Sequence, residues 1–393
     1  MSRGRAACRR VCIVTGSRAE FGLLRPVIDA VAAHPRLERR LVAAGAHFLA
    51  PARTIREVRA SYPIVAEVRM QRAARSGRTE RADDAGAAGR GMASFARVFA
   101  RERPDWVVVL GDRIEAFAAA AAASIGGWAV AHVHGGDRAE GIADEAMRHA
   151  ISKLAHLHLA ATRRSAGRLI RMGEPAERVH VVGSPAIDGL RPGHIRALDE
   201  DSWEDLGRPR AVLLMHPSGD SFADRSFTEA ALRAARAHAV EPLLVLAPNH
   251  DPGREAVLAP ILGRLRRGTP MGGVVFRQHL ARESFLGLLL RVRAHGCLIG
   301  NSSAGLIECA ALGVRAVNLG RRQAGRERAG NVIDVPVAEG PAVDDAIRRA
   351  LRPRGRTRYA RTFGDGRAGA RIAELLAGID PRDAELRRKR NAY

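Results

Sequence analysis

Aromatic residues and lysines are scarce in this chain of 393 residues. Phe, Trp and Tyr make up 4% of the sequence, and only Lys153 and Lys389 are lysines. Because proteins that bind single-stranded nucleic acid stack bases on aromatic side chains, this scarcity argues against that class. The formal net charge of +22 comes from arginines spread over nearly every segment. That spread indicates an Arg- and Ala-rich coding bias rather than a basic stripe that binds a polyanion.

Sequence signals for membrane insertion, export, nucleotide cofactors and metal binding are also missing. No charge-free run of about 18 apolar residues is present, and the first residues do not resemble a signal peptide, so we expect a soluble, cytoplasmic protein that does not bind membranes. Neither GxGxxG nor GxxxxGK[ST] occurs at the first strand, which disfavours nicotinamide cofactors and P-loop chemistry. The cysteines lack CxxC or metal-ligand spacing and are predicted to be buried thiols; they are Cys8, Cys12, Cys297 and Cys309.

The length and the apolar content of 46% predict about two domains with sizeable cores. Short apolar runs alternate with amphipathic stretches, which is typical of parallel sheets covered by helices. The fold class is therefore α/β, with two Rossmann-like domains whose strand ends face a cleft. The predicted strands are 11–16, 40–46, 106–112, 129–135, 157–162, 179–185, 211–217, 242–249, 273–278, 294–301 and 315–320.

The domain boundaries follow from a change of composition after residue 187. Proline, glycine and acids replace apolar periodicity there, so we place an N-terminal domain at 1–188 and a linker at 189–209. A C-terminal domain is expected at 210–365. The C-terminal helix and basic tail, 366–393, are expected to pack back on the N-terminal domain, with the final RRKRNAY as a solvated end.

The segment 132–162 is dense in histidines and acids around a Gly135-Gly136 turn. Asp144 and Arg148 are four residues apart on a predicted helix, so they share a face and can pair, and a carboxylate beside a guanidinium stays ionised. The alternative for Asp144 is a first-turn acid that complements the helix dipole. A metal site is the weaker interpretation of the histidines, which are His132, His134, His149, His156 and His158.

Two further candidates follow buried strands of the first domain. Asp112 comes directly after a strand and a glycine, where acids of α/β folds serve ligands, but it is equally suited to cap the Ala-rich helix. Arg18 lies ahead of a helix N-terminus, an arrangement that suits a phosphate. Ordinary turn chemistry is the alternative for Arg18.

In the second domain, His216 and Asn249 end consecutive strands. A neutral histidine at that place can pass protons or bind phosphate, or it can simply satisfy a loop carbonyl. The run GNSSAGLIE is the strongest indication of an anion-binding site, because a serine cap leaves backbone amides free at a helix N-terminus. We expect phosphates at Ser302, Ser303 and Gly305.

Glu308 lies further along the same predicted helix. A carboxylate near a nucleotide can accept both ribose hydroxyls. The alternative is a partly buried glutamate in a capped helix. Arg322, on the following loop, is either a phosphate neighbour or part of the general arginine surplus.

Together these motifs resemble the UDP-N-acetylglucosamine 2-epimerases. The motifs that carry this resemblance are TGSRAE, LGDR, HVHGGDRAEGIADEAMRHAISKLAHLH, PNHDPG, GNSSAGLIE and NLGRRQAGR. HxHGG followed by DE-x-x-RH is similar to the hydrolysing branch of sialic-acid and nonulosonate pathways, whereas the non-hydrolysing branch usually has HVEAG. The resemblance implies a glycosyltransferase B fold, a UDP-sugar substrate, no metal or nicotinamide cofactor, and a homo-oligomer, dimer or tetramer.

The implied reaction eliminates UDP to a glycal and then adds water, releasing the free 2-epimer. By matching motifs, Asp112, Asp137 and Asp144 are the acid/base candidates, Arg148 orients that site, and His216 assists near the diphosphate. The implied substrate and UDP binders are Arg18, His134, Asn249, Ser302, Ser303, Gly305, Glu308 and Arg322.

This sequence departs from the family pattern at Asp137, where a glutamate is usual, and at His134, where the non-hydrolysing branch has a glutamate. The acid that acts as base and the exact sugar, N-acetylglucosamine or a diacetamido-trideoxy sugar, therefore stay open. A non-hydrolysing epimerase and a glycosyltransferase of the same fold are the alternatives, and a nucleic-acid or polyanion binder is the non-enzymatic one.

Overall fold

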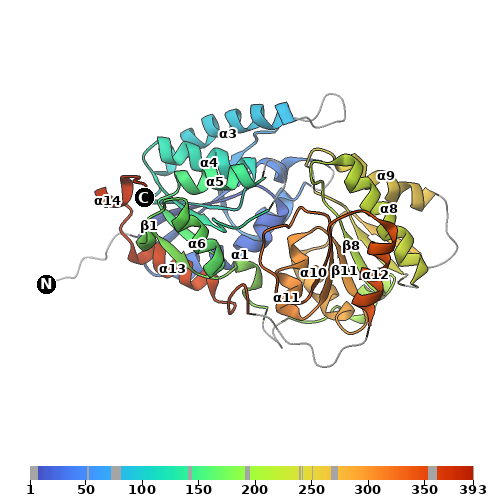
Figure 1. The fold of residues 1–393 in the computed structure, drawn as a ribbon. Coiled ribbons are helices and arrows are strands. Elements are labelled where there is room, and N and C mark those ends of the chain that lie inside the picture. The colour runs from blue at the N-terminus through green and yellow to red at the C-terminus, as the bar shows by residue number, and fades with distance from the viewer. Residues whose placement is uncertain are drawn as a thin grey trace. The chain divides into compact units, whose positions relative to one another are not determined.

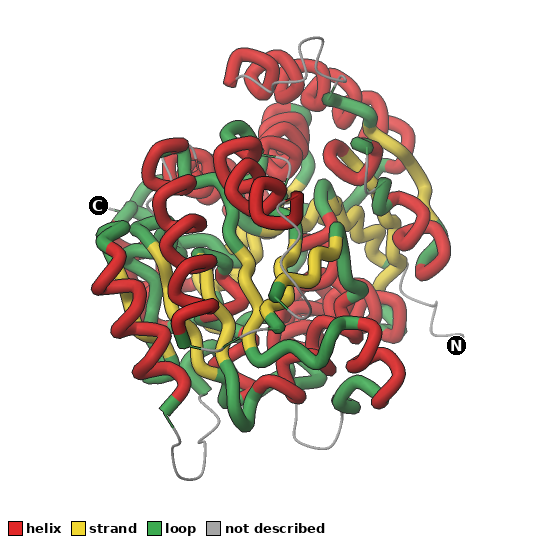
Figure 2. Tube along the Cα trace, turned by 90° about the vertical axis from the view of Figure 1, so that its right-hand side faces the viewer, coloured by secondary structure: helices red, strands yellow, loops and turns green. Residues whose placement is uncertain are grey.

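The computed structural model of the chain describes residues 8–50, 53–71, 81–139, 144–190, 195–238, 240, 242–249, 251–266, 273–352 and 361–392, without the side chains of 81 and 144. It divides into two compact units (Figure 1). The first comprises Met1–Asp137, Ala143–Asp188 and Gly364–Tyr393, and the second Arg138–Ile142 and Gly189–Phe363. Each contains one parallel sheet covered by helices (Figure 2), so the predicted pair of parallel α/β domains is confirmed.

The first unit has a seven-stranded sheet of order β3-β2-β1-β4-β5-β6-β7. Its order reverses between β1 and β4, and ligands of such sheets bind outside the carboxyl ends of the strands at that place. The sequence prediction missed β3, a short, half-buried edge strand. The strands are β1 (Arg9–Thr15), β2 (Leu37–Ala44), β3 (Ile64–Val68), β4 (Trp106–Leu110), β5 (Ala129–Val133), β6 (Leu157–Ala160) and β7 (Val179–Val181).

Alternate residues of this sheet face two separate cores. Val11 and Ile13 of β1 pack with α1 and α13, whereas Cys12 and Val14 pack with α3, α4 and α5. This is the period of two that a strand buried on both faces requires. The helices are α1 (Arg18–Ala33), η1 (Gly45–Phe48), α2 (Ile55–Ser61), α3 (Arg81–Glu102), α4 (Ile114–Ile125), α5 (Asp144–Leu154), α6 (Arg163–Arg171), η2 (Ala176–Arg178), η3 (Pro185–Ile187), α13 (Ala368–Gly378) and α14 (Ala384–Arg387).

The second unit has a six-stranded sheet of order β10-β9-β8-β11-β12-β13, which reverses between β8 and β11. One core of this unit lies between the sheet and α8, α9 and α12. The strands are β8 (Ala211–Leu214), β9 (Leu243–Leu246), β10 (Val274–Arg277), β11 (Cys297–Gly300), β12 (Arg315–Leu319) and β13 (Val332–Val335). The helices are α7 (Glu200–Asp205), α8 (Ser221–Ala237), α9 (Arg254–Arg266), α10 (Arg282–Val292), η4 (Ser303–Gly305), α11 (Glu308–Leu312) and α12 (Gly340–Leu351).

The predicted linker contains packed structure where it is described. Asp199 caps α7 by accepting from the backbone N–H of Ser202 at 2.7 Å. Arg291 of α10 donates to the carbonyl of Leu198 at 2.7 Å. These contacts attach the segment to the second unit.

The final basic residues are mostly exposed, as expected of a solvated end, but the tail is also attached to the first unit, because Lys389 donates to the carbonyl of Ala155 at 2.6 Å and the Ala392 amide to that of Gly173 at 2.8 Å. The expectation that all four cysteines are buried is wrong. Cys8 is exposed, whereas the other three cysteines are buried. The pKa values of Cys12 and Cys297 are raised to about 12, mainly by burial.

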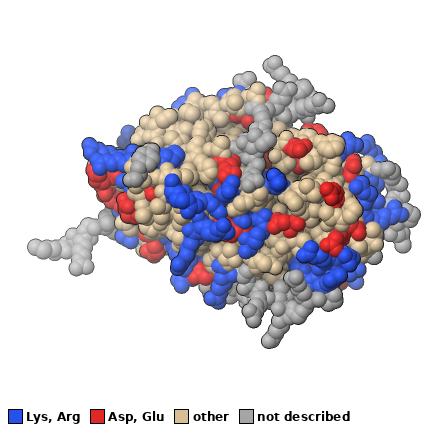
Figure 3. Space-filling model, in the orientation of Figure 1, with Lys and Arg blue, Asp and Glu red and all other residues tan. Residues whose placement is uncertain are grey.

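The charged surface is mixed. On the face drawn in Figure 3, Lys and Arg form several separate groups with Asp and Glu between them. This distribution agrees with arginines spread along the sequence. Within the described residues, no helix combines the length and apolar character needed to span a membrane.

Candidate active site

Asp112 and Arg148 form an ion pair at the carboxyl end of the first sheet. Gly111, at a φ of 77°, turns the chain out of β4, and its amide donates to the carbonyl of Val133 at 3.0 Å. The Arg148 side chain is 2% exposed and that of Asp112 is 21% exposed. A buried cation thus holds a carboxylate that solvent can reach. Asp112 does not cap α4, whose N-cap is Arg113, so that alternative is wrong.

Asp144 is the first residue of α5, but its side chain lies outside the part of the structure that is described. The predicted pair between Asp144 and Arg148 therefore stays a prediction. Arg148 also donates to the carbonyl of His134 at 3.3 Å, which joins α5 to the end of β5.

Asp137 and His134 belong to a buried network. His134 Nδ1 lies 2.8 Å from Asp137 Oδ2, and His134 Nε2 lies 2.9 Å from Ser184 Oγ. The other oxygen of Asp137 accepts from Ser165 Oγ at 2.7 Å. Both ring nitrogens and both carboxylate oxygens therefore have protein partners. In this conformation neither side chain offers a free polar atom to a ligand, so their catalytic and binding roles stay predictions.

His132 supports the turn that presents Asp112. Its Nε2 lies 2.8 Å from the Gly111 carbonyl and its Nδ1 lies 3.1 Å from Ser152 Oγ. Burial lowers the pKa of His132 to about 3, so the ring is neutral at physiological pH. Among the described residues, no group of three His, Cys, Asp or Glu side chains has the arrangement of a metal site.

Two buried glutamates, in the first turns of α1 and α4, interact with each other, and neither is among the predicted catalytic or binding residues. Glu20 is 6% exposed and accepts from the Gly16 amide at 2.8 Å. Glu115 is fully buried and accepts from Gln71 Nε2 at 2.6 Å. Burial and the charge of Glu115 raise the pKa of Glu20 to about 8. The signal was present, because Ser17 and Glu20 have capping-box spacing.

Arg18, the predicted phosphate binder, is the first residue of α1, next to this pair. Its side chain is partly buried, and burial lowers its pKa. A partly desolvated guanidinium at the carboxyl end of β1 has the position that an anion site requires.

In the second unit, Asn301 joins the ends of β8 and β11. Its Oδ1 accepts from the His216 amide at 2.7 Å and its Nδ2 donates to the His216 carbonyl at 2.8 Å. His216 Nδ1 accepts from the Asn249 amide at 3.2 Å, so a neutral ring carries its proton on Nε2. The predicted pair His216 and Asn249 is brought together here. Asn301 lies within the GNSSAGLIE run but is not among the predicted site residues, and it orders the turn.

The run GNSSAGLIE does not form the single helix that was expected. Ser302 caps the short turn η4, accepting from the Ala304 amide at 3.4 Å, and the five-residue helix α11 begins at Glu308. A Cβ on Gly305 would meet the Cβ of Ala316 at 3.1 Å, so this glycine serves packing against the sheet.

The remaining UDP candidates also have protein partners. Glu308 is 5% exposed and forms an ion pair with Arg282 at 3.1 Å. Arg322 Nη1 donates to the Asn301 carbonyl at 3.4 Å, and Gln323 Nε2 donates to the same carbonyl at 2.9 Å. The loop after β12 is thereby tied to the turn that holds His216. Ser303, the other predicted binder, lies in η4, half-buried.

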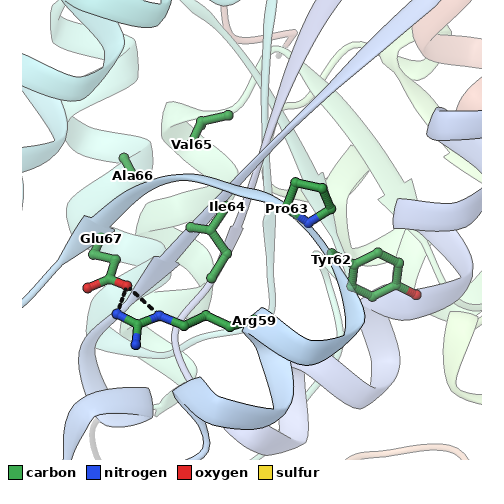
Figure 4. A pocket seen from close by; sticks show the side chains of 7 residues that line it. All are labelled: Arg59, Tyr62, Pro63, Ile64, Val65, Ala66 and Glu67. Atoms are coloured by element: carbon green, nitrogen blue, oxygen red, sulfur yellow. Dashed lines mark hydrogen bonds and ion pairs between the residues drawn. The ribbon is translucent and has the colours of Figure 1, made fainter.

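Two surface hollows of about 410 Å³ each lie on the described residues. One is lined by Tyr62 and most of β3, with Arg59 donating to Glu67 at 2.9 Å (Figure 4). It runs along the edge strand β3 and contains no predicted site residue. The other follows β12 and includes Arg321 and Arg328. It lies at the carboxyl ends of β12 and β13, where UDP is predicted to bind, so it is the better candidate of the two hollows.

Comparisons with known proteins agree with the motifs. The family model for UDP-N-acetylglucosamine 2-epimerase matches residues 29–377. The chain is 33% identical over 391 residues to the UDP-N,N'-diacetylbacillosamine 2-epimerase (hydrolyzing) of Legionella pneumophila, covering 98% of this chain and 100% of the relative. It is 30% identical over 378 residues to the UDP-N-acetylglucosamine 2-epimerase of Neisseria meningitidis, covering 94% and 95%.

Solved structures share the fold. The UDP-GlcNAc 2-epimerase from Neisseria meningitidis bound to UDP-GlcNAc aligns with a TM-score of 0.78 at 18% identity, covering 94% of this chain and 100% of that one. The enzyme from Methanocaldococcus jannaschii in complex with UDP-GlcNAc and UDP aligns with a TM-score of 0.75 at 18% identity, covering 93% and 99%. Sequence and fold agree along nearly the whole chain, which belongs to the UDP-N-acetylglucosamine 2-epimerase family.

Proposed function

We propose that this protein is a hydrolysing 2-epimerase of a UDP-2-acetamido sugar. The observation that carries the proposal is the Asp112–Arg148 pair, an accessible carboxylate on a buried guanidinium at the carboxyl end of the central strands. The guanidinium favours the ionised carboxylate, which is the form that a general base needs. The hydrolysing relative from Legionella pneumophila, similar over 98% of this chain, supports the branch.

The chemistry has two stages. The C1–O bond breaks with its electron pair going to UDP, a base takes the proton from carbon 2, and the resulting glycal has a C1=C2 double bond. Water then gives its hydroxyl to carbon 1, and a proton returns to carbon 2 from the opposite face. Asp112 is our candidate for the first proton transfer, because the oxygens of Asp137 are occupied by His134 and Ser165.

The departing diphosphate needs cations or aligned donors. We assign this role to His216, whose neutral ring presents Nε2–H, with Arg322 nearby on the Asn301 carbonyl. Asn301 holds both groups and therefore serves as a positioning residue. Arg18 is the corresponding cation of the first unit.

The test is turnover of UDP-N-acetylglucosamine and UDP-N,N'-diacetylbacillosamine in deuterium oxide, followed by mass spectrometry and NMR. We expect free UDP and a free 2-epimeric sugar with one deuterium at carbon 2. A UDP-bound epimer in equilibrium with substrate would indicate the non-hydrolysing reaction. Sugar transfer that needs an added acceptor and leaves carbon 2 undeuterated would indicate a glycosyltransferase. Binding of polyanions without UDP binding would contradict enzymatic function altogether.

The identity of the sugar is a further part of what we propose. Asp137 does not indicate an unusual sugar, because its carboxylate oxygens contact His134 and Ser165 in this conformation. The Legionella pneumophila relative is a UDP-N,N'-diacetylbacillosamine 2-epimerase, so a diacetamido-trideoxy sugar is tested as a substrate beside N-acetylglucosamine. Homo-oligomerisation, which the family resemblance implies, is tested by size-exclusion chromatography with light scattering.

A further inference from the structure

The only two lysines of the chain converge on one buried carboxylate, Glu174. Glu174 is 0% exposed and lies just beyond α6. Lys153 of α5 is 2.8 Å from its Oε1, and Lys389 of the C-terminal tail is paired with its Oε2. His158 Nε2 lies 2.7 Å from the same Oε2. The tail thus contributes a charge to the interior of the first unit.

Each lysine also binds two other acceptors. Lys389 Nζ donates to the carbonyl of Ala155 at 2.6 Å and to that of Ser152 at 3.5 Å. Lys153 Nζ donates to the carbonyl of Met172 at 3.0 Å and to Asn391 Oδ1 at 2.5 Å. An ammonium group has three tetrahedrally arranged donors, whereas a guanidinium is planar. The acceptor geometry gives a reason for lysine at these places in an arginine-rich chain.

Two connections lead from this cluster to the candidate active site. The carbonyls that Lys389 binds belong to the last turn of α5 and the residue after it, where a cation stabilises a helix end. Ser152 Oγ in turn donates to the carbonyl of Arg148 at 3.0 Å. His158 lies opposite His132 in the parallel pair of β5 and β6, and His132 contacts the Gly111 carbonyl next to Asp112.

We propose that Lys389 is a positioning residue for the epimerase reaction: with Lys153 it neutralises Glu174 beside His158, and it fixes the end of α5, the helix that carries Arg148. The proposal rests on the proposed function for its kinetic part only. The clamp itself, defined as Lys153, His158, Glu174 and Lys389, is a structural statement that can be tested without substrate.

Electrostatics support the assignment. Burial lowers the pKa of His158; Glu174 opposes this, and Lys389 and Lys153 lower it further. The other titratable groups whose charges interact with His158 are His132 and His156. Removal of Lys389 leaves Glu174 with one lysine, so His158 becomes the group that supplies the missing positive charge. Its affinity for a proton then rises.

The kinetic test compares Lys389→Met with Arg390→Met. Arg390 is one residue away, exposed, and paired with Glu385 on the surface, so it controls for loss of a tail charge. We expect Lys389→Met to lower kcat about tenfold with KM within twofold of wild type, since small displacements of catalytic groups reduce rate more than binding. The acid limb of its pH profile should move to higher pH. Arg390→Met should match wild type.

Lys389→Arg separates charge from shape. It should restore the wild-type acid limb, because the charge is retained, but not the full kcat, because a planar guanidinium cannot reach all three acceptors. If the loss of kcat is equal in Arg390→Met, or if Lys389→Met keeps both wild-type kcat and pH profile, the positioning role is excluded.

A second measurement keeps the clamp testable if no substrate is turned over. In histidine-labelled protein, the His158 signal, assigned from a His158→Gln spectrum, should titrate at higher pH in Lys389→Met than in wild type. If Lys389→Met does not fold, the double variant Glu174→Gln/Lys389→Met should fold, because neither buried charge remains. A His158 signal that titrates identically in wild type and Lys389→Met would overturn the proposal even with an active enzyme.

Discussion

Asp112 combines access to solvent with the charge support of a buried arginine, as a proton-transfer group requires. Asp112→Asn keeps the size and a hydrogen bond to Arg148 but removes the basic oxygen. We expect kcat to fall by about 10² to 10⁴, the range that general acid–base catalysis contributes, with little change in folding. The measurement is steady-state release of UDP together with a thermal unfolding curve.

Asp365→Asn is the matched control for this prediction. Asp365 also pairs with an arginine of the first unit, Arg371 at 2.7 Å, but on the surface, with 41% of its side chain exposed. It should retain wild-type activity. Wild-type kcat in Asp112→Asn would remove Asp112 from the catalytic set and leave Asp144 as the leading candidate.

Asn301 permits a separate test of the UDP side. Asn301→Ala removes both hydrogen bonds to the His216 backbone, so the turn should lose its fixed position. We expect UDP affinity to fall about tenfold, equivalent to about 1.4 kcal/mol, as measured by calorimetry. Arg291→Ala, which removes a donor to the Leu198 carbonyl at 2.7 Å ahead of the amino end of β11, should bind UDP as wild type does. Equal losses in the two variants would show a general effect on the unit.

At the scale of elements, α13 shows how closely the C-terminal helix packs on α1. A Cβ on Gly369 would lie 2.4 Å from the carbonyl oxygen of Pro26, whereas a Cβ on Gly378, at the end of the same helix, meets nothing within 4 Å. We expect Gly369→Ala to lower the free energy of unfolding by about 1 to 3 kcal/mol, the usual cost of overpacking. Gly378→Ala should be neutral or slightly stabilising, because alanine favours helix.

Urea unfolding of the two variants checks this prediction. A loss of equal size in both would point to helix propensity or the unfolded chain rather than to the α1–α13 contact. Gly369→Ala at wild-type stability would mean that α13 can shift away from Pro26 without cost.

The same elements show what the sequence could and could not predict. Buried strands such as β4 and β5 were found because they are short apolar runs that end at glycine, and the acid after β4 follows from that pattern. The edge strand β3 was missed because half-buried residues weaken the apolar signal. The His134–Asp137–Ser184 network and the Glu174 clamp join residues far apart in sequence, and no local pattern encodes which distant partner a polar side chain finds.

At the scale of the whole molecule, buried titratable groups decide how the first unit responds to pH. Burial lowers the pKa of His132 to about 3 and those of His47 and His156 to about 4. In the unfolded chain, histidine has a pKa of about 6.5. Between about pH 4 and 6.5 the unfolded state therefore binds more protons, and stability falls as pH is lowered. Each histidine contributes about 2 kcal/mol of this loss between pH 7 and 5.

Glu20 acts in the opposite direction. Its pKa is raised to about 8 by burial and Glu115, so the folded state holds a proton that an unfolded glutamate, with a pKa of about 4.3, has lost. Its contribution to stability falls as pH rises from about 4.3 to 8. Below about pH 6.5 the buried histidines outweigh this one carboxyl, and above about pH 7 Glu20 outweighs them. We therefore expect the first unit to be most stable near pH 6.5 to 7.

Urea unfolding at pH 5, 6, 7 and 8 tests this expectation. Trp106 and Trp128 lie in the first unit and Trp203 in the second, so fluorescence of a Trp203→Phe background reports on the first unit alone. In that background His47→Gln, which can keep hydrogen bonds to Thr15 and Thr54, should reduce the loss between pH 7 and 5 by about 2 kcal/mol, the contribution of one such histidine. The exposed His295→Gln should leave the loss unchanged. A pH dependence that is the same in both variants would show that His47 is not neutral in the folded unit, and that its burial does not set the acid limit of stability.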